Sequence, residues 1–163
     1  SVAPDSPDGM ESFVSSDYRQ SLECLTGPFE VTYNVWNQAD QPCDTFYGRV
    51  DYQWCGEGST LVGQHDGNWG GMPFTSAFLV ACDETTQTCS MGWSRADGTT
   101  AIPMQSTDPY SPYGEFSVTR DTQDSSTKSV LTINDTNSHT IQRYSTDECG
   151  EEHLVLEIIC TRQ

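Results

Sequence analysis

The chain has 163 residues, enough for one domain with a single core. Hydrophobic residues make up 34% of it and aromatic residues 10%, which is more aromatic content than a disordered chain shows. Its 24 acidic and 7 basic residues give a net charge of −17, which argues against nucleic acid or anionic lipid as a partner because both carry the same sign. No stretch approaches the roughly 20 apolar residues of a membrane helix, so we expect a chain that does not span a membrane.

The first 25 residues precede the strand-like part of the chain. Residues 1–12 hold two prolines, one glycine and three acids, and we expect a flexible N-terminal arm there. Residues 13–25 predict one short helix that Gly27-Pro28 ends. Four apolar residues lie near one face of this helix: Phe13, Tyr18, Leu22 and Leu25.

From Phe29 onward the apolar residues recur at every second position, the pattern of strands with one buried and one exposed face. The strand-like segments in chain order are 29–36, 46–54, 59–69, 74–83, 88–98, 115–122, 128–135, 138–145 and 153–162. Between the fifth and sixth of these come the shorter segment 101–106 and a Pro/Tyr-rich loop. The sequence therefore predicts an all-β fold of about eight or nine strands.

Most of these segments are joined by short polar turns that leave no room for a helix. Sequential antiparallel pairing is the simplest topology for such a chain. A meander of this kind either closes into a barrel or folds into two packed sheets. We expect a single domain over residues 13–163.

A short helical lead that runs into Gly27-Pro28-Phe29 at the start of the first strand resembles the lipocalin (calycin) group. Lipocalins carry Gly-x-Trp there, and the aromatic residue closes the floor of the barrel. The resemblance spans residues 13–163, with Phe29 in place of the tryptophan and too few residues between the last two strands for the long helix of that family. It implies a closed β-barrel whose interior binds a small apolar or pigment-like molecule.

Seven cysteines are dispersed through the chain, none in a CxxC pair, which is typical of a disulfide-stapled domain in an oxidising compartment. Cys82 and Cys89 flank one hairpin loop and form the first predicted bridge. The other predicted bridges join Cys43 to Cys55, although Cys24 could compete for either of these, and Cys24 to Cys160, because the first and last strands of a closed barrel are neighbours. Cys149 is then left over, and the carboxylates that flank it argue against a role as a nucleophile.

These observations predict a secreted protein, or one from another oxidising compartment, with Ser1 at or near a processing site. Asn134-Asp135-Thr136 is a glycosylation acceptor sequence, which is consistent with secretion. An odd number of cysteines is also compatible with an oligomer, either disulfide-linked or non-covalent.

Aromatic and arginine residues within the strand-like segments are the candidates for ligand binding. Tyrosine and tryptophan together outnumber phenylalanine by eleven to six, and these rings carry polar groups suited to a cavity that holds a planar or conjugated ligand. An arginine within a strand can pair with an acidic group of the ligand. The predicted ligand-binding residues are Tyr33, Tyr52, Trp54, Trp69, Phe78, Trp93, Arg95 and Arg120.

The three histidines, His65, His139 and His153, are far apart in the sequence and show no metal-binding spacing, so we predict no metal site. Isolated histidines of this kind are more often unrelated surface or turn residues. His65 precedes Asp66, and a carboxylate can orient an imidazole. His65 is therefore the candidate acid or base if the protein is an enzyme. No GxSxG motif or other catalytic signature is present.

Three functions are compatible with these features. The first is a secreted binding protein that holds a small hydrophobic or conjugated molecule inside a β-barrel, for example a tetrapyrrole, a carotenoid or a lipid. The second is a disulfide-rich extracellular interaction or surface protein without a small ligand. The third is a barrel enzyme of isomerase or lyase type. We favour the first, and lean away from an enzyme.

Overall fold

The computed structural model describes residues 21–36, 44–83, 88–95, 98–99, 102–103, 105–106, 115–121 and 126–163. Within these ranges the protein is almost entirely β-structure, preceded by the 3-10 turn η2 (Glu23–Leu25). The predicted arm over residues 1–12 and most of the predicted helix lie outside the described residues. None of the described helical residues forms a helix long and apolar enough to cross a membrane.

Nine antiparallel strands of seven or more residues form the described fold, which confirms the predicted number. They are β1 (Gly27–Val35), β2 (Asp44–Cys55), β3 (Thr60–Trp69), β4 (Met72–Asp83), β5 (Thr88–Arg95), β9 (Glu115–Asp121), β10 (Ser126–Asp135), β11 (Ser138–Thr146) and β12 (Glu152–Arg162). Three strands of two residues each lie between β5 and β9: β6 (Gly98–Thr99), β7 (Ile102–Pro103) and β8 (Gln105–Ser106).

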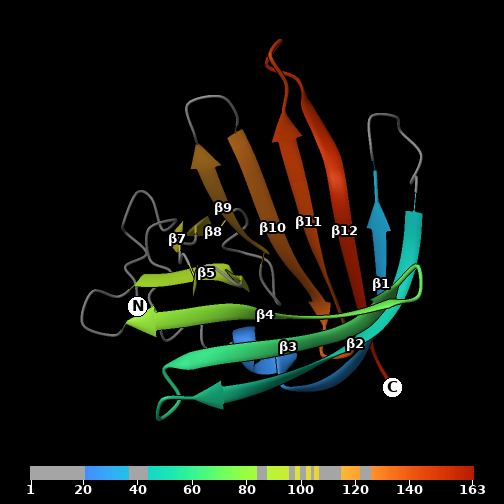
Figure 1. Cartoon of the computed structure of the whole chain (residues 1–163). Helices are drawn as coiled ribbons and strands as arrows, with labels where there is room; N and C mark the ends of the chain where they lie inside the picture. Colours follow the sequence, from blue (N-terminus) through green and yellow to red (C-terminus); the bar gives the residue numbers. More distant parts are fainter. Residues whose placement is uncertain are drawn as a thin grey trace.

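All of these strands belong to one sheet, with the order β6-β5-β4-β3-β2-β1-β12-β11-β10-β9-β8 and β7 paired to β5. Consecutive strands are neighbours, as a meander requires, and one ladder joins the two halves of the chain. In it, Phe29 of β1 is the Cα partner of Arg162 of β12. Figure 1 shows the result: the green strands β2–β5 sweep across one side of the curl and the brown to red strands β9–β12 form the other.

The sheet is curled but open, so the expectation of a closed barrel was wrong. The order of strands ends at β6 on one side and at β8 on the other, and these two strands do not pair. Among the described residues between β5 and β9, the strands are two residues long. Pro103 of β7 has no N–H to donate to a continuing ladder.

Alternation along the strands separates the buried concave face from the exposed one. In β1 the buried residues Phe29, Val31 and Tyr33 alternate with the exposed Glu30 and the half-buried Thr32. The same period places the rest of the core on the concave face: Val50, Tyr52, Leu61, Phe78, Val80, Met91, Phe116, Leu131, Ile133, Ile141 and Ile158. The hydrophobic core of the domain therefore fills the interior of the curl.

Glycines on the concave face of β3 make room for aromatic rings. A Cβ atom added at Gly63 would lie 2.5 Å from Cε2 of Tyr52, and one added at Gly67 would lie 2.5 Å from the ring of Phe74. Each ring thus lies directly over glycine backbone on the neighbouring strand. These two positions require glycine for steric reasons.

The cysteines do not form the predicted bridge between Cys24 and Cys160. Both are unpaired: Cys24 is half-buried on η2, whereas Cys160 is fully buried on β12 with its side chain in the interior. Cys55 is also an unpaired thiol, exposed at the end of β2, so its predicted bridge to Cys43 is not formed; Cys43 itself lies outside the described residues. The prediction was wrong because neighbouring strands do not guarantee that two thiols face each other.

Cys82 and Cys89 remain a predicted pair. Their Cα atoms are direct partners in the ladder between β4 and β5, but their side chains are outside the described part of the structure. Cys149, the predicted remainder, is an exposed unpaired thiol in the turn between β11 and β12.

Candidate functional site in the interior of the curled sheet

Two tyrosine–histidine pairs lie in the interior of the sheet. The hydroxyl of Tyr33 on β1 is 2.7 Å from Nδ1 of His65 on β3, and that of Tyr52 on β2 is 3.0 Å from Nε2 of His139 on β11. All four side chains are almost fully buried, with exposed fractions of 4% or less. The pairs bring together residues from both halves of the chain.

The second pair is possible only because the sheet is curled. Strands β2 and β11 are separated by β1 and β12, so in a flat sheet their side chains would stand about 14 Å apart. The Tyr52–His139 hydrogen bond instead spans the concave face directly. Figure 1 shows these strands on the two sides of the curl. The Tyr52–His139 pair therefore ties opposite walls of the interior together, whereas the Tyr33–His65 pair links β1 to β3 on one wall.

Burial sets the protonation of these groups. It lowers the pKa of His65 to about 4, and it lowers that of His139 to about 3 with smaller contributions from His65 and Arg162. Burial also raises the pKa of both tyrosines above the ordinary value for a phenol. At neutral pH each pair is consequently a neutral phenol beside a neutral imidazole.

Within the described part of the chain, one nitrogen of each imidazole has no hydrogen-bond partner. These atoms are Nε2 of His65 and Nδ1 of His139, and both are buried. Buried polar atoms in folded proteins are almost always paired, so an orphan of this kind calls for a ligand or a water molecule as its partner. Two orphans in one interior mark the region as a candidate binding site.

A stack of aromatic rings leads from the surface to this region. The ring of Tyr33 is stacked on that of Phe46 at 4.8 Å, and Phe46 is stacked on Trp69 at 5.1 Å, each with an interplanar angle of 10°. Phe74 contacts both Tyr33 and Phe46 edge-on at 5.4 Å. Trp69 is 50% exposed whereas Tyr33 is buried. We call the rings of Tyr33, Phe46 and Trp69 the aromatic stack.

The opposite end of the interior is sealed by Arg162. Its Nη1 donates to the carbonyl of Thr26 at 2.8 Å, its Nη2 to that of Cys24 at 3.0 Å, and its Nε to that of Thr136 at 3.0 Å. The guanidinium also lies 4.3 Å above the ring of Phe29. Leu22 and Leu25, fully buried, belong to the same core cluster. We refer to this end as the floor.

The structure brings most of the predicted ligand-binding residues together. Tyr33, Tyr52 and Phe78 are buried in the interior, and the half-buried Trp93 packs 5.0 Å from Phe78 and 5.2 Å from His65. Trp54 is half-buried against the same core.

Three of the predicted residues are placed differently. Trp69 lies at the solvent end of the aromatic stack and donates from Nε1 to Asp44. Arg95 and Arg120 are on β5 and β9, and their side chains lie outside the described part of the chain.

The sequence reasoning missed His139. His65 and His139 are 0% and 1% exposed, so the expectation that the histidines are surface or turn residues was wrong for both. A signal was available for His139, because it is two positions before the buried Ile141 in an alternating strand. The sequence could not indicate the hydrogen-bond partner of His139, because Tyr52 is 87 residues away.

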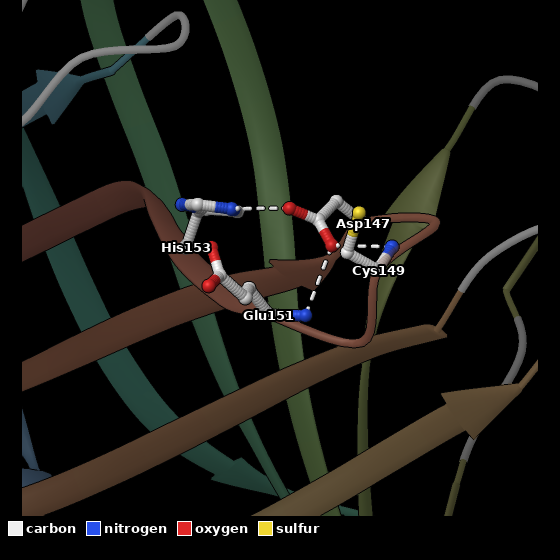
Figure 2. Close-up of polar contacts among 4 residues, drawn as sticks. All are labelled: Asp147, Cys149, Glu151 and His153. Atoms are coloured by element: carbon white, nitrogen blue, oxygen red, sulfur yellow. Dashed lines mark hydrogen bonds and ion pairs between the residues drawn. The ribbon is translucent and has the colours of Figure 1, made fainter.

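His153 is the histidine that does lie at the surface, at the start of β12 beside the turn from β11. Its Nε2 is 2.8 Å from Oδ2 of Asp147, whose Oδ1 accepts the N–H groups of Cys149 and Glu151 at 2.8 and 2.9 Å. Figure 2 shows these contacts. The hydrogen bond with His153, followed by that from Glu151, holds the pKa of Asp147 below its ordinary value. These contacts account for a tight turn.

Asp147, Glu151 and His153 are also metal-binding residue types, and one potential ligand atom from each lies within 4.8 Å of the others. All three are exposed. The hydrogen bonds already made by Asp147 occupy both of its oxygens, so the turn explains the cluster without an ion.

The fold and the interior site define a curled, antiparallel, β-barrel-like protein. Comparison with known proteins identifies its family. A family profile described as "Protein of unknown function (DUF1579)" matches residues 15–162. The chain belongs to this family. A search of curated protein sequences gave no match.

Two solved structures share the fold. Rv2717c from M. tuberculosis has a TM-score of 0.63 at 12% identity, over 88% of this chain and 96% of that one. The S-type phycobiliprotein lyase CPES from Guillardia theta has a TM-score of 0.63 at 8% identity, over 96% of this chain and 98% of that one. At such identities the likeness concerns the fold alone.

Proposed function

We propose that this protein binds a small planar, largely apolar molecule against the concave face of its curled sheet. The observation that carries the proposal is the aromatic stack, which extends from the half-exposed Trp69 to the buried Tyr33 beside His65. Flat rings at this spacing offer a conjugated ligand a stacking surface. The candidate ligands of the proposal are a tetrapyrrole, a carotenoid or a lipid.

The fold supports the same proposal. The solved structure from Guillardia theta is an S-type phycobiliprotein lyase, so this architecture occurs in a protein that acts on phycobiliproteins. A lipocalin-like relationship is part of the proposal: Gly27 turns the chain at φ 97°, and Phe29 lies at the floor beneath Arg162. The unpartnered histidine nitrogens are consistent with an interior that accepts a ligand.

Two measurements test the proposal. Native protein purified without added ligand is expected to carry visible absorbance or extra mass in native mass spectrometry. Stripped protein is then titrated with a planar fluorescent dye. Phe46→Leu should weaken binding of the dye severalfold because it interrupts the aromatic stack.

The neighbouring residue supplies a matched control. Tyr47 is 66% exposed, so Tyr47→Leu should leave dye affinity unchanged. Equal affinities for Phe46→Leu and the parent protein would contradict the proposed site.

A barrel enzyme of isomerase or lyase type is the second candidate. The Tyr33–His65 hydrogen bond of 2.7 Å favours it, since a phenol–imidazole pair can relay a proton. His65→Gln would then abolish conversion of a bound compound while leaving its affinity intact. If ligand is bound and released unchanged by the parent protein, the binding function stands alone.

We also propose that the protein is secreted and that it binds a partner protein, and each of these proposals rests on separate observations. Asn134, the predicted glycosylation acceptor, is exposed, and the Cα atoms of Cys82 and Cys89 are direct partners in the ladder between β4 and β5. Both observations support an oxidising compartment. The exposed thiols of Cys55 and Cys149 support an oligomer or an interaction protein. Intact mass with and without reductant detects any bridge, and a non-reducing gel of Cys149→Ser detects an intermolecular one.

A further inference from the structure

The two tyrosine–histidine pairs fix which hydrogen-bonding groups the interior presents. The neutral Tyr33 has one hydrogen on its hydroxyl, and the neutral His65 has one on its ring. The hydroxyl contacts Nδ1 of His65 at 2.7 Å. Either the phenol donates to Nδ1, or Nδ1–H donates to the phenol oxygen.

The first arrangement satisfies more of these groups. If the phenol donates, only the N–H at Nε2 of His65 is left without a partner. If Nδ1–H donates, both the phenol hydrogen and the lone pair of Nε2 are left without one. Unsatisfied buried polar groups are costly, so the phenol donates and Nε2 carries the hydrogen. Tyr52 and His139 obey the same argument, which leaves a free Nδ1–H on His139.

The surroundings of His65 define what Nε2–H can bind. The imidazole lies 5.2 Å from the ring of Trp93 and 5.9 Å from that of Tyr33, and it is 0% exposed. These neighbours are neutral and mostly apolar. An ionised carboxylate placed there would lose its hydration and gain only neutral donors, which is unfavourable. An uncharged oxygen meets the N–H at much lower cost.

We propose that the interior ligand carries an uncharged carbonyl oxygen in conjugation with a planar ring system, and that this oxygen accepts a hydrogen bond from Nε2 of His65. The inference rests on the proposed binding function and specifies its ligand class: conjugated ketones, aldehydes or quinones. The aromatic stack contacts the rings of the ligand, and His65 selects its polar group. His139 is nearer the floor, with its ring 4.7 Å from Phe29, and holds a second donor.

Three naphthalenes of nearly equal shape test this ligand class. They are 2-acetylnaphthalene with a ketone, 2-isopropenylnaphthalene with a hydrocarbon in its place, and 2-naphthoate with a carboxylate. We expect the ketone to bind roughly fivefold more tightly than the hydrocarbon, the value of one hydrogen bond. We expect the carboxylate to bind more weakly than either.

A variant locates the effect at His65. In His65→Phe the ketone and the hydrocarbon should bind equally, with the affinity for the hydrocarbon close to that of the parent protein. His153→Gln, at the exposed turn, is the matched control and should keep the fivefold preference. A preference that survives in His65→Phe overturns the role of His65, and a preference for the naphthoate overturns the uncharged ligand.

Nitrogen-15 NMR of the labelled parent protein tests the inference without a variant that has to fold. The expected spectrum has an unprotonated Nδ1 and a protonated Nε2 for His65, and the reverse for His139. The opposite tautomer of His65 overturns the inference. Binding of the ketone and the hydrocarbon with equal affinity overturns the ligand class but leaves the binding function intact, whereas no binding of any probe contradicts the binding function itself.

Discussion

The two ends of the interior are built in opposite ways. At the floor, Arg162 uses three of its nitrogens on backbone carbonyls and covers Phe29, and Leu22 and Leu25 are completely buried. At the other end the side chains of Trp69 and Met72 are 50% and 72% exposed. The floor is a structural seal, whereas the aromatic end is made of groups that solvent or a ligand can reach. Stability and binding should therefore respond to mutations at different ends.

Removal of the seal should have the largest effect. Arg162→Met keeps an unbranched apolar side chain over Phe29 but leaves the carbonyls of Thr26, Cys24 and Thr136 without their charged donor. We expect a loss of about 4 kcal/mol or more in the free energy of unfolding, since each charge-assisted bond is worth roughly 1.5–3 kcal/mol. Urea unfolding measures it. A loss below about 1 kcal/mol would show that the floor is not sealed by Arg162.

Acid should have the next largest effect, through the buried histidines between the two ends. Their pKa values are lower in the folded protein than in the unfolded chain, whose histidines titrate near 6.5. Below pH 6.5 the unfolded chain thus binds more protons, and stability falls as the pH falls toward about 4. Between pH 7 and pH 5 we expect a loss of about 3–4 kcal/mol for the two histidines together.

Urea unfolding at pH 7, 6 and 5 checks this dependence. Met72→Leu is the control and should show the same loss, because this exposed side chain has no titratable group. A variant that lacks His65 should show about half the pH dependence. Stability that is constant over this range would mean that the histidines are not buried as neutral groups.

A smaller effect is expected at Gly63, which lies beneath the ring of Tyr52. An added Cβ would lie 2.5 Å from that ring, so Gly63→Ala must displace Tyr52 and strain its hydrogen bond to His139. We expect a loss of about 2 kcal/mol in the free energy of unfolding. Gly63 has no positive φ, so no backbone strain adds to this loss. An unchanged free energy of unfolding in Gly63→Ala would remove the steric explanation.

The smallest change in stability is expected at the exposed end. Trp69→Leu removes the outermost ring of the aromatic stack, which is half exposed. The free energy of unfolding should fall by less than about 1 kcal/mol, while affinity for a planar ligand falls severalfold. Thermal melting and dye titration of the same variant separate the two effects. A large loss of stability with unchanged affinity would reverse the roles assigned to the two ends.

Much of the fold could be predicted because its signal is local. The alternation of Phe29, Val31 and Tyr33 with polar residues depends only on neighbours in the sequence, and the same is true of the other long strands. The placement of β12 beside β1 followed from barrel geometry and is confirmed by the ladder between them. The open seam was not predicted, because it depends on the two short edge strands β6 and β8, which pair with β5 and β9 but not with each other.

The candidate site was predictable in kind but not in detail. Aromatic residues on the concave face were expected, and Tyr33, Tyr52, Phe78 and Trp93 are there. The bond between Tyr52 and His139 depends on the curl of the whole sheet, which no local pattern encodes. The bridge between Cys24 and Cys160 was wrong: it was inferred from adjacent strands, whereas Cys24 lies on η2 ahead of β1 and both thiols are free.

The ladder between β1 and β12 also has a consequence for how the chain folds. Among the described strands of seven or more residues, every other ladder joins consecutive strands, so each of them closes only a short loop. The β1–β12 ladder pairs Phe29 with Arg162 and must close nearly the whole chain. Contacts of such large sequence separation slow folding. Because the sheet is interrupted instead near residues 98–106, a circularly permuted chain that starts there, with the present ends joined, would shorten the loop that this ladder closes to the residues between Arg162 and Gly27.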